Sequence, residues 1–201
     1  MEQHEVYLVL TRSHTLLSRL IHQVTQKPYT HAGICLDGHL TGFYTFGRRY
    51  TYSIWPAGLT EESLLKGVFQ LQSQSPCAIY RLRIDHEQYL RLKRLIQTMY
   101  AHRNAYKYHF LGIVKCQLGI IHKRPYYYFC SQFVAEVLEN AQITHLPKDP
   151  SLMQPCDLTM LEGLECVYEG TVADLCRRLD PQWRPSSFFL HSYHYLKSLI
   201  R

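Results

Sequence analysis

The sequence predicts an α+β protein in which an antiparallel sheet packs against helices. Short β-rich runs alternate with segments whose apolar residues recur at helical spacing, in the order strand, helix, hairpin, strand, helix, helix. The Asp37-Gly38 dipeptide lies between two apolar runs. Such a dipeptide is a strong hairpin signal, and hairpins join antiparallel strands.

The first predicted elements are a buried strand and a helix. The strand covers residues 5–11 (EVYLVLT). Ser13 is placed to cap a helix over residues 14–26, where five aliphatic side chains share one face. A Lys-Pro dipeptide then ends this helix.

A hairpin is expected next. Residues 30–36 (THAGICL) predict its first strand, and residues 40–46 (LTGFYTF) predict the returning strand. Residues 47–69 contain Pro56 and several glycines, which predicts a loop-rich segment.

The second half predicts two further strands and two clear helices. Residues 77–84 alternate as a strand should, and Asp85 is placed to cap the helix that follows. Residues 130–141 carry an apolar stripe at i, i+3 and i+4 spacing and predict a helix. Residues 166–169 (CVYE) predict a last short strand.

Composition narrows the classes of function. The net charge is +6, but the basic residues are scattered and match no nucleic-acid-binding motif, so no nucleic-acid partner is expected. No run approaches the ~20 apolar residues of a membrane-spanning helix, and the N-terminus lacks signal-peptide features. We therefore expect a cytoplasmic protein with free thiols. Paired Cys and His spacings typical of zinc sites are missing from the sequence, so no metal or other cofactor is expected.

Cys130 stands at the predicted start of a helix, directly after the aromatic run Tyr126–Phe129. Unpaired N–H groups and the helix dipole favour a thiolate there, and the thiolate is the nucleophilic form. The other reading is a small buried hydrophobic residue, which is how we interpret the remaining six cysteines.

His31 is the candidate base for this nucleophile. In an alternating strand, His31, Gly33 and Cys35 share one face, while Ala32 and Ile34 share the apolar face. Small neighbours leave room for a helix carrying Cys130 to pack on the His31 face. A hydrogen-bonded strand histidine without a catalytic role is the alternative.

Together, THAGICLD followed by a hairpin and, much later, YYFCSQFVAEVLE resemble the circularly permuted branch of the NlpC-type papain-like cysteine hydrolases. The YiiX-like proteins and the lecithin:retinol acyltransferase-like enzymes belong to this branch, in which the histidine strand precedes the cysteine helix. Phe46-Gly47-Arg48 and Tyr168-Glu169-Gly170 add to the resemblance, which covers roughly residues 5–170.

The resemblance implies that Cys130 is the nucleophile and His31 the general base. It also implies a polar residue on the following strand that orients the imidazole. A two- or three-residue turn would pair His31 with Tyr44 or Thr45 and makes these two the candidates. Glu61 and Glu62 are the alternatives, because neither candidate is a histidine, an acid or an asparagine.

Further site residues follow from the same arrangement. The backbone N–H groups of Cys130 and Ser131 are expected to donate to an oxyanion. Tyr106, Tyr108 and Tyr128 are expected to line the substrate pocket. A tyrosine from Tyr106, Tyr108 or the Tyr126–Tyr128 run is the candidate second oxyanion donor.

The expected architecture is one permuted papain-like domain over residues 1–179. Residues 180–201 are expected to form a linker and an amphipathic helix that folds back on the domain, which makes membrane contact by this segment the less favoured reading.

The expected activity is hydrolysis of an amide bond in a small peptide-like substrate, such as one derived from the cell wall. Two alternatives stay open: a thiol acyltransferase or esterase acting on a lipid, and a non-catalytic binding module that retains the fold. The sequence does not give the oligomeric state.

Overall fold

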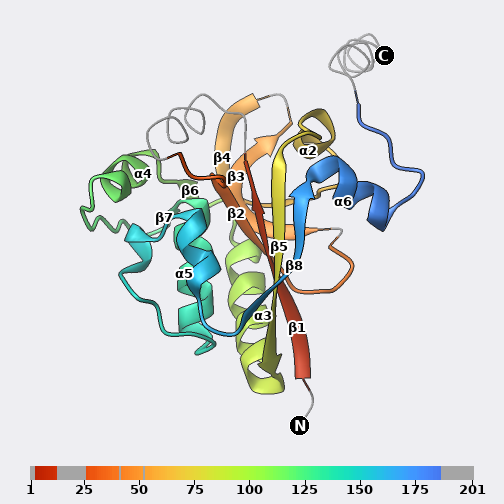
Figure 1. The fold of residues 1–201 in the computed structure, drawn as a ribbon. Helices are drawn as coiled ribbons and strands as arrows, with labels where there is room; N and C mark the ends of the chain where they lie inside the picture. Colours follow the sequence, from red (N-terminus) through yellow and green to blue (C-terminus); the bar gives the residue numbers. More distant parts are fainter. Residues whose placement is uncertain (1–2, 13–25, 41, 52, 187–201) are drawn as a thin grey trace.

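A six-stranded sheet with helices on both faces forms the body of the protein (Figure 1). The computed structural model describes residues 3–12, 26–40, 42–51 and 53–186. Every neighbouring strand pair in this sheet is antiparallel, in the order β4-β3-β2-β1-β5-β8. The strands are β1 (Gln3–Thr11), β2 (His31–Cys35), β3 (Phe43–Tyr50), β4 (Ser53–Glu62), β5 (Pro76–Asp85) and β8 (Leu164–Thr171). The predicted α+β class with an antiparallel sheet is confirmed.

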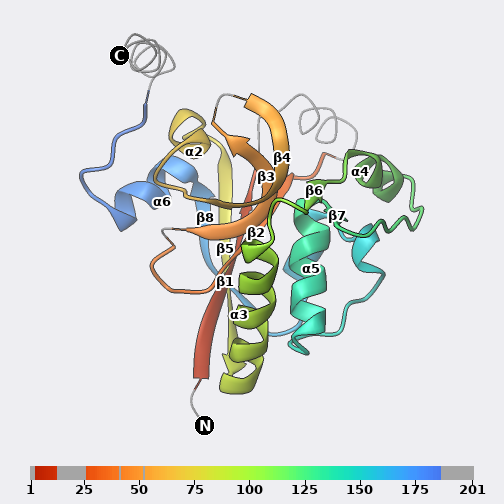
Figure 2. The ribbon, with the colours of Figure 1, turned by 180° about the vertical axis from the view of Figure 1, so that it is seen from behind.

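The remaining elements surround this sheet (Figure 2). The helices are α2 (Val68–Leu71), α3 (His86–Ala101), α4 (Phe110–Gln117), α5 (Cys130–Asn140) and α6 (Val172–Leu179). A second, parallel pair consists of β6 (Lys107–Tyr108) and β7 (Tyr127–Tyr128). Two short 3-10 helices, η1 (Pro150–Leu152) and η2 (Pro155–Met160), follow α5.

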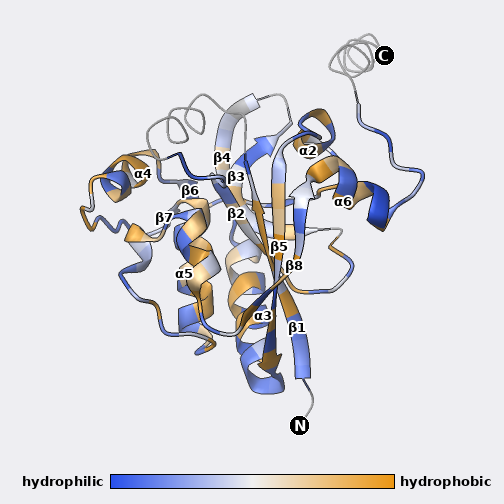
Figure 3. Cartoon of the chain, viewed as in Figure 1, coloured by the Kyte–Doolittle hydropathy of each residue, from blue (hydrophilic) through white to orange (hydrophobic). Residues whose placement is uncertain are grey.

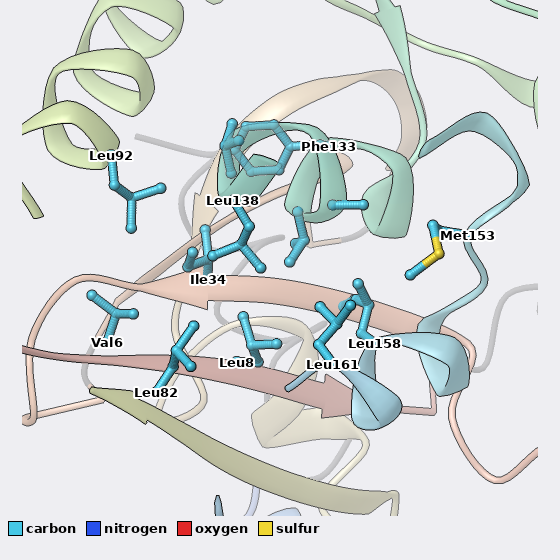
Figure 4. Packing of buried hydrophobic residues seen from close by; sticks show 14 of the residues in the cluster. Val6, Leu8, Ile34, Leu82, Leu92, Phe133, Leu138, Met153, Leu158 and Leu161 are labelled. Carbon is cyan, nitrogen blue, oxygen red and sulfur yellow. The ribbon is translucent and has the colours of Figure 1, made fainter. Parts of the chain in front are cut away.

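Helices α3 and α5 cover one face of the sheet and bury the larger core (Figure 4). Alternate residues of the central strands point to this face because side chains alternate along a strand. The strand residues Val6, Leu8, Leu10, Ala32 and Ile34 belong to the same buried cluster as Leu92, Phe133 and Leu138 of the helices.

Helix α5 therefore packs on the apolar Ala32 and Ile34 face, and the expectation that it would pack on the His31 face was wrong. The apolar stripe of α5 needs an apolar surface, which Ala32 and Ile34 provide. Its N-terminal end lies beside β6 and β7, and this end carries Cys130 (Figure 1).

Helices α2 and α6 cover the opposite face. Phe69 of α2 and Val172 of α6 share a buried cluster with Val9 and Phe43 of the sheet. Trp183 joins this cluster and donates its indole N–H to the carbonyl of Leu65 at 2.9 Å.

Part of the predicted C-terminal segment thus lies against the sheet domain, up to residue 186. Residues 187–201, with the expected terminal helix, lie outside the described residues, and so does nearly all of the predicted helix 14–26. The division at residue 179 stays a prediction.

The predicted cap of α3 is confirmed. The Asp85 carboxylate accepts a hydrogen bond from the backbone N–H of Gln88 at 2.8 Å. The Gln88 side chain accepts one from the backbone N–H of Asp85 at 3.1 Å, which completes a capping box.

The loop-rich prediction for residues 47–69 was wrong. Strand β3 continues to Tyr50, and residues 53–62 form β4 opposite it. Pro56 fits within β4 because this strand is at the edge of the sheet, where a missing N–H breaks no ladder on the open side.

The predicted register between β2 and β3 was also wrong. Ile34 pairs with Tyr44, so His31 lies in register with Gly47 instead of residue 44 or 45. The connection is longer than a tight turn: the Asp37 carboxylate accepts from the N–H of His39 at 3.0 Å, and Leu40 has a φ of 53°. These local features lengthen the turn and shift the pairing.

The last predicted strand is present and longer than expected, because β8 runs from Leu164 to Thr171. Cys166 in this strand is exposed and Cys156 is partly exposed, so the reading of all six other cysteines as buried was wrong for these two. All seven cysteines are described and free. Among the described residues, no helix combines the length and apolar character that crossing a membrane requires.

Candidate active site

Cys130 is the first residue of α5 and is almost completely buried, at 4 % exposure. Phe129 before it is extended, with φ −111° and ψ 169°, so the helix begins abruptly at the cysteine. The first turn contains no acidic residue that would oppose a negative sulfur. The unpaired N–H groups and the positive end of the helix dipole are therefore close to the thiol.

His31 lies between an acid and this cysteine. Its Nε2 is 3.0 Å from Oε2 of Glu62, and both side chains are largely buried. The Cys130 side chain is also close enough to contribute to raising the pKa of the imidazole.

The charges around His31 outweigh its burial. Burial lowers the pKa of His31, but the Glu62 carboxylate, the hydrogen bonds to Cys130 and Glu62 and a negative Cys130 sulfur raise it to about 10. The imidazole therefore holds its proton at neutral pH, which places a positive charge near the Cys130 side chain.

Thr45, the first of the two predicted orienting residues, is fully buried beside the imidazole. Its hydroxyl oxygen is 3.5 Å from Nε2 of His31. The same hydroxyl donates to the carbonyl of Ala32 at 2.6 Å, so its oxygen can only accept from the ring. Thr45 thus supports the position of the ring, at a longer distance than Glu62.

Tyr44, the second predicted orienting residue, does not join the site. Its ring packs against Tyr100, with centroids 5.3 Å apart, and belongs to the core on the α5 face. Successive strand residues point to opposite faces, so Tyr44 and Thr45 cannot both face the imidazole. Of the two alternative acids, Glu62 reaches His31, whereas Glu61 is exposed and lies beside Gly42.

Gly47 provides the space in which His31 and Glu62 meet. A Cβ atom at this position would lie 2.7 Å from Oε1 of Glu62 and 3.6 Å from Cε1 of His31. The first distance is too short for a real contact, so any side chain here would displace the carboxylate.

Of the three predicted pocket tyrosines, Tyr108 is the one whose pKa is influenced by Cys130. Burial, followed by the charges of Cys130 and Glu62, raises the pKa of Tyr108 well above its usual range. This phenol therefore keeps its proton and can donate it in a hydrogen bond.

The other two tyrosines form an aromatic cluster below the site. The rings of Tyr106 and Tyr128 both pack against Phe46. The Tyr128 hydroxyl donates to Oε1 of Glu136 at 3.0 Å. These contacts fix β6 and β7 on the sheet and position the start of α5.

The predicted oxyanion donors stand at the helix start. The Ser131 hydroxyl donates to the carbonyl of Met153 at 2.7 Å, so this side chain is committed to anchoring η1. The backbone N–H groups of Cys130 and Ser131 are at the first turn, where a helix has no internal partner for them.

A cavity of about 230 Å³ opens on the far side of Glu62. Its lining includes Arg48, Lys66, Glu62 and Phe69, and the Phe69 ring is 6.4 Å from that of His31. Burial lowers the pKa of Arg48, and Glu62 opposes this shift. Cys130 is not among the lining residues.

Sequence reasoning ranked Glu62 behind Thr45 and Tyr44, and it named Gly47 only within the Phe46-Gly47-Arg48 motif, without a role in the site. A strand assignment for residues 53–62 would have been the signal, because it places Glu62 on the strand next to β3. Within the described ranges, no group of three or more His, Cys, Asp or Glu side chains could hold a metal ion.

Comparison with known proteins adds no family to this picture. No model of a known protein family matches the chain, and a search of curated proteins gives no match either.

Proposed function

We propose that this chain is a cysteine hydrolase with a permuted papain-like fold, which cleaves an amide bond of a small peptide-like substrate. The observation that carries the proposal is the buried His31 imidazole, 3.0 Å from the Glu62 carboxylate, with the Cys130 side chain near enough to raise its pKa. A nucleophile, a base and an orienting group linked in this way form the constellation of nucleophilic acyl transfer. The chain order, with the histidine strand before the cysteine helix, supports the permuted form of the fold.

The geometry supports a two-step reaction. The Cys130 thiolate attacks the carbonyl carbon, and the C–N bond breaks as His31 gives its proton to the leaving amine. This leaves a thioester on Cys130 and a neutral imidazole. His31 then accepts a proton from water, the hydroxide oxygen adds to the thioester carbon, and the acid leaves with the thiolate restored.

Two kinds of donor are available for the oxyanion. The Cys130 N–H is at the open end of α5, and the Tyr108 phenol is held protonated in the same buried environment. Donors fixed before the reaction stabilise developing charge more than mobile water does. Glu62 and Thr45 act as positioning residues, since they contact the imidazole and not the sulfur.

A second candidate is hydrolysis or transfer of an acyl chain from a lipid ester. The same thiolate chemistry applies, with an alcohol in place of the amine as leaving group. The exposed apolar residues of α4, next to the cysteine end of α5, favour this candidate.

Alkylation of Cys130 by iodoacetamide at neutral pH, followed by peptide mass spectrometry, tests the proposal. We expect faster labelling of Cys130 than of the more accessible Cys166, despite its burial, and slower labelling of Cys130 in His31→Ala. The labelled protein should also lose turnover in a screen of amides and lipid esters. If Cys130 reacts no faster than Cys166 and ignores the His31 change, a non-catalytic binding module replaces the enzyme.

A further inference from the structure

Helix α4 and the turn after it present an apolar surface to solvent (Figure 3). We define the α4 surface by six residues that are between 39 and 68 % exposed: Phe110, Leu111, Val114, Leu118, Ile120 and Ile121. Trp55 of β4 extends it, with its ring stacked on Phe110 at a centroid distance of 6.4 Å and 63 % exposure. Large apolar patches of this kind mark sites of interaction.

This exposure is not needed to attach the helix, because α4 already buries its opposite side. Ile113 and Cys116 pack against Phe129 in a separate small core. Gly119, with a φ of 70°, ends the helix, and the N–H of Ile120 returns to the carbonyl of Lys115 at 2.9 Å. Helix α4 thus has one apolar side that packs in this small core and a second apolar side that is exposed to solvent.

The charged residues in the stretch of chain around α4 are all basic. From residue 88 to residue 135 the sequence contains no Asp or Glu. The basic residues in this range are Arg91, Lys93, Arg94, Arg103, Lys107, Lys115, Lys123 and Arg124. The last four adjoin the α4 surface in sequence, and of these Lys123 is paired with Asp149 at 2.9 Å.

The same positive field acts on a histidine under the surface. Burial lowers the pKa of His109, and His122, Arg124 and Lys115 lower it further. Cationic groups therefore converge around α4 in space as well as along the chain.

We propose that the α4 surface docks on an anionic lipid bilayer, with α4 lying in the plane of the interface. Aliphatic and aromatic side chains with a basic surround are typical of interfacial helices, which insert apolar residues and attract acidic headgroups. Five of the six residues that define the α4 surface are aliphatic and offer no stacking platform for nucleic acid. The lack of acidic residues along residues 88–135 favours a negatively charged surface as the occupant.

Docking has a consequence for the site that rests on the proposed function. Phe129, which packs under α4, directly precedes Cys130. A bilayer held by α4 would therefore lie close to the thiol and offer acyl lipids as substrates. Binding itself does not depend on catalysis, so the two proposals can fail separately.

The test uses the full chain carrying Cys130→Ser, so that turnover plays no part. Sedimentation with vesicles of phosphatidylcholine, with or without phosphatidylserine, measures binding. We expect binding only with phosphatidylserine, weakened by added salt. Leu118→Ser with Ile121→Ser should weaken it at least about tenfold, and Lys107→Gln about fivefold.

Matched controls lie away from this surface. Met160→Ser removes an apolar side chain that is 82 % exposed, and Arg94→Gln removes an exposed charge on α3. Neither should change binding. All variants keep residues 187–201, so a selective loss is assigned to α4, and circular dichroism verifies that each variant is folded.

Two results would overturn the proposal. One is a lack of phosphatidylserine-dependent binding by the parent, or equal losses in the control variants. The other is self-association of the parent in solution that Leu118→Ser with Ile121→Ser abolishes, together with no vesicle binding by the parent or by this variant. The surface would then be a contact between two copies of this chain.

Discussion

Glu62→Gln isolates the contribution of the orienting carboxylate. The change keeps the size of the side chain and removes its charge. The glutamine amide can still form a hydrogen bond with Nε2 of His31. The variant therefore removes the ion pair and keeps the contact. The charge of Glu62 is the largest of the influences that raise the pKa of the imidazole, and the two side chains are 3.0 Å apart.

The magnitude follows from the burial and the distance of this pair. The His31 and Glu62 side chains are 10 % and 14 % exposed, with 3.0 Å between Nε2 and Oε2. Loss of an opposite charge at such a distance lowers a pKa by about 1–3 units. The pKa of His31, raised to about 10 in the parent, therefore falls in Glu62→Gln, because less charge opposes the lowering of this pKa by burial. One unit corresponds to about 1.4 kcal/mol, or about tenfold in the ion-pair population.

We expect alkylation of Cys130 near neutral pH to slow at least about tenfold in Glu62→Gln, since less positive charge faces the sulfur. Peptide mass spectrometry reads every cysteine in one sample. Cys35, Cys77 and Cys176 are buried, and burial raises their pKa values to about 11, 12 and 11, so they give the slow limit. Exposed Cys166 reports the reactivity of an accessible thiol.

Glu61→Gln is the matched control, because Glu61 is the neighbouring carboxylate and is exposed. It should leave labelling of Cys130 unchanged. The reasoning is refuted if Glu62→Gln labels Cys130 as fast as the parent while His31→Ala slows it, because the base would then act without its carboxylate.

Three further outcomes are expected. Gly47→Ala should slow labelling of Cys130 as Glu62→Gln does, because the new Cβ would lie 2.7 Å from Oε1 of Glu62; unchanged labelling would show that the carboxylate relaxes freely. Tyr108→Phe should leave alkylation intact but reduce turnover about 10²-fold, the usual cost of an oxyanion donor, and an unchanged turnover number would remove this tyrosine from the mechanism. The ring of His31 should titrate near pH 10 by NMR, against 6.5 for a free histidine. The stability that its ion pair adds is therefore complete below pH 6.5 and is lost as the pH rises through the folded value. The free energies of unfolding of the parent and Glu62→Gln, measured in urea, should converge with rising pH, and a difference that grows would contradict this reasoning.

The sequence by itself determined the elements that depend on local patterns. Helical spacing and the aromatic run placed Cys130 at the start of α5, and alternation placed His31 on a strand. The Asp85 cap was readable in the same way, because its partner is only three residues away. Such features arise from neighbours in the chain, whose geometry is fixed by the backbone.

The tertiary structure decided which side chain completes the site. An irregular connection with Leu40 at a positive φ shifted the β2–β3 register, and the edge strand β4 then brought Glu62 to His31. Space at Gly47 and the influence of Cys130 and Glu62 on the pKa of Tyr108 likewise come from segments far apart in the chain. Strand register is set by long-range pairing and by the exact geometry of turns, and a change of one residue reverses every side chain, so these contacts followed only from the assembled sheet.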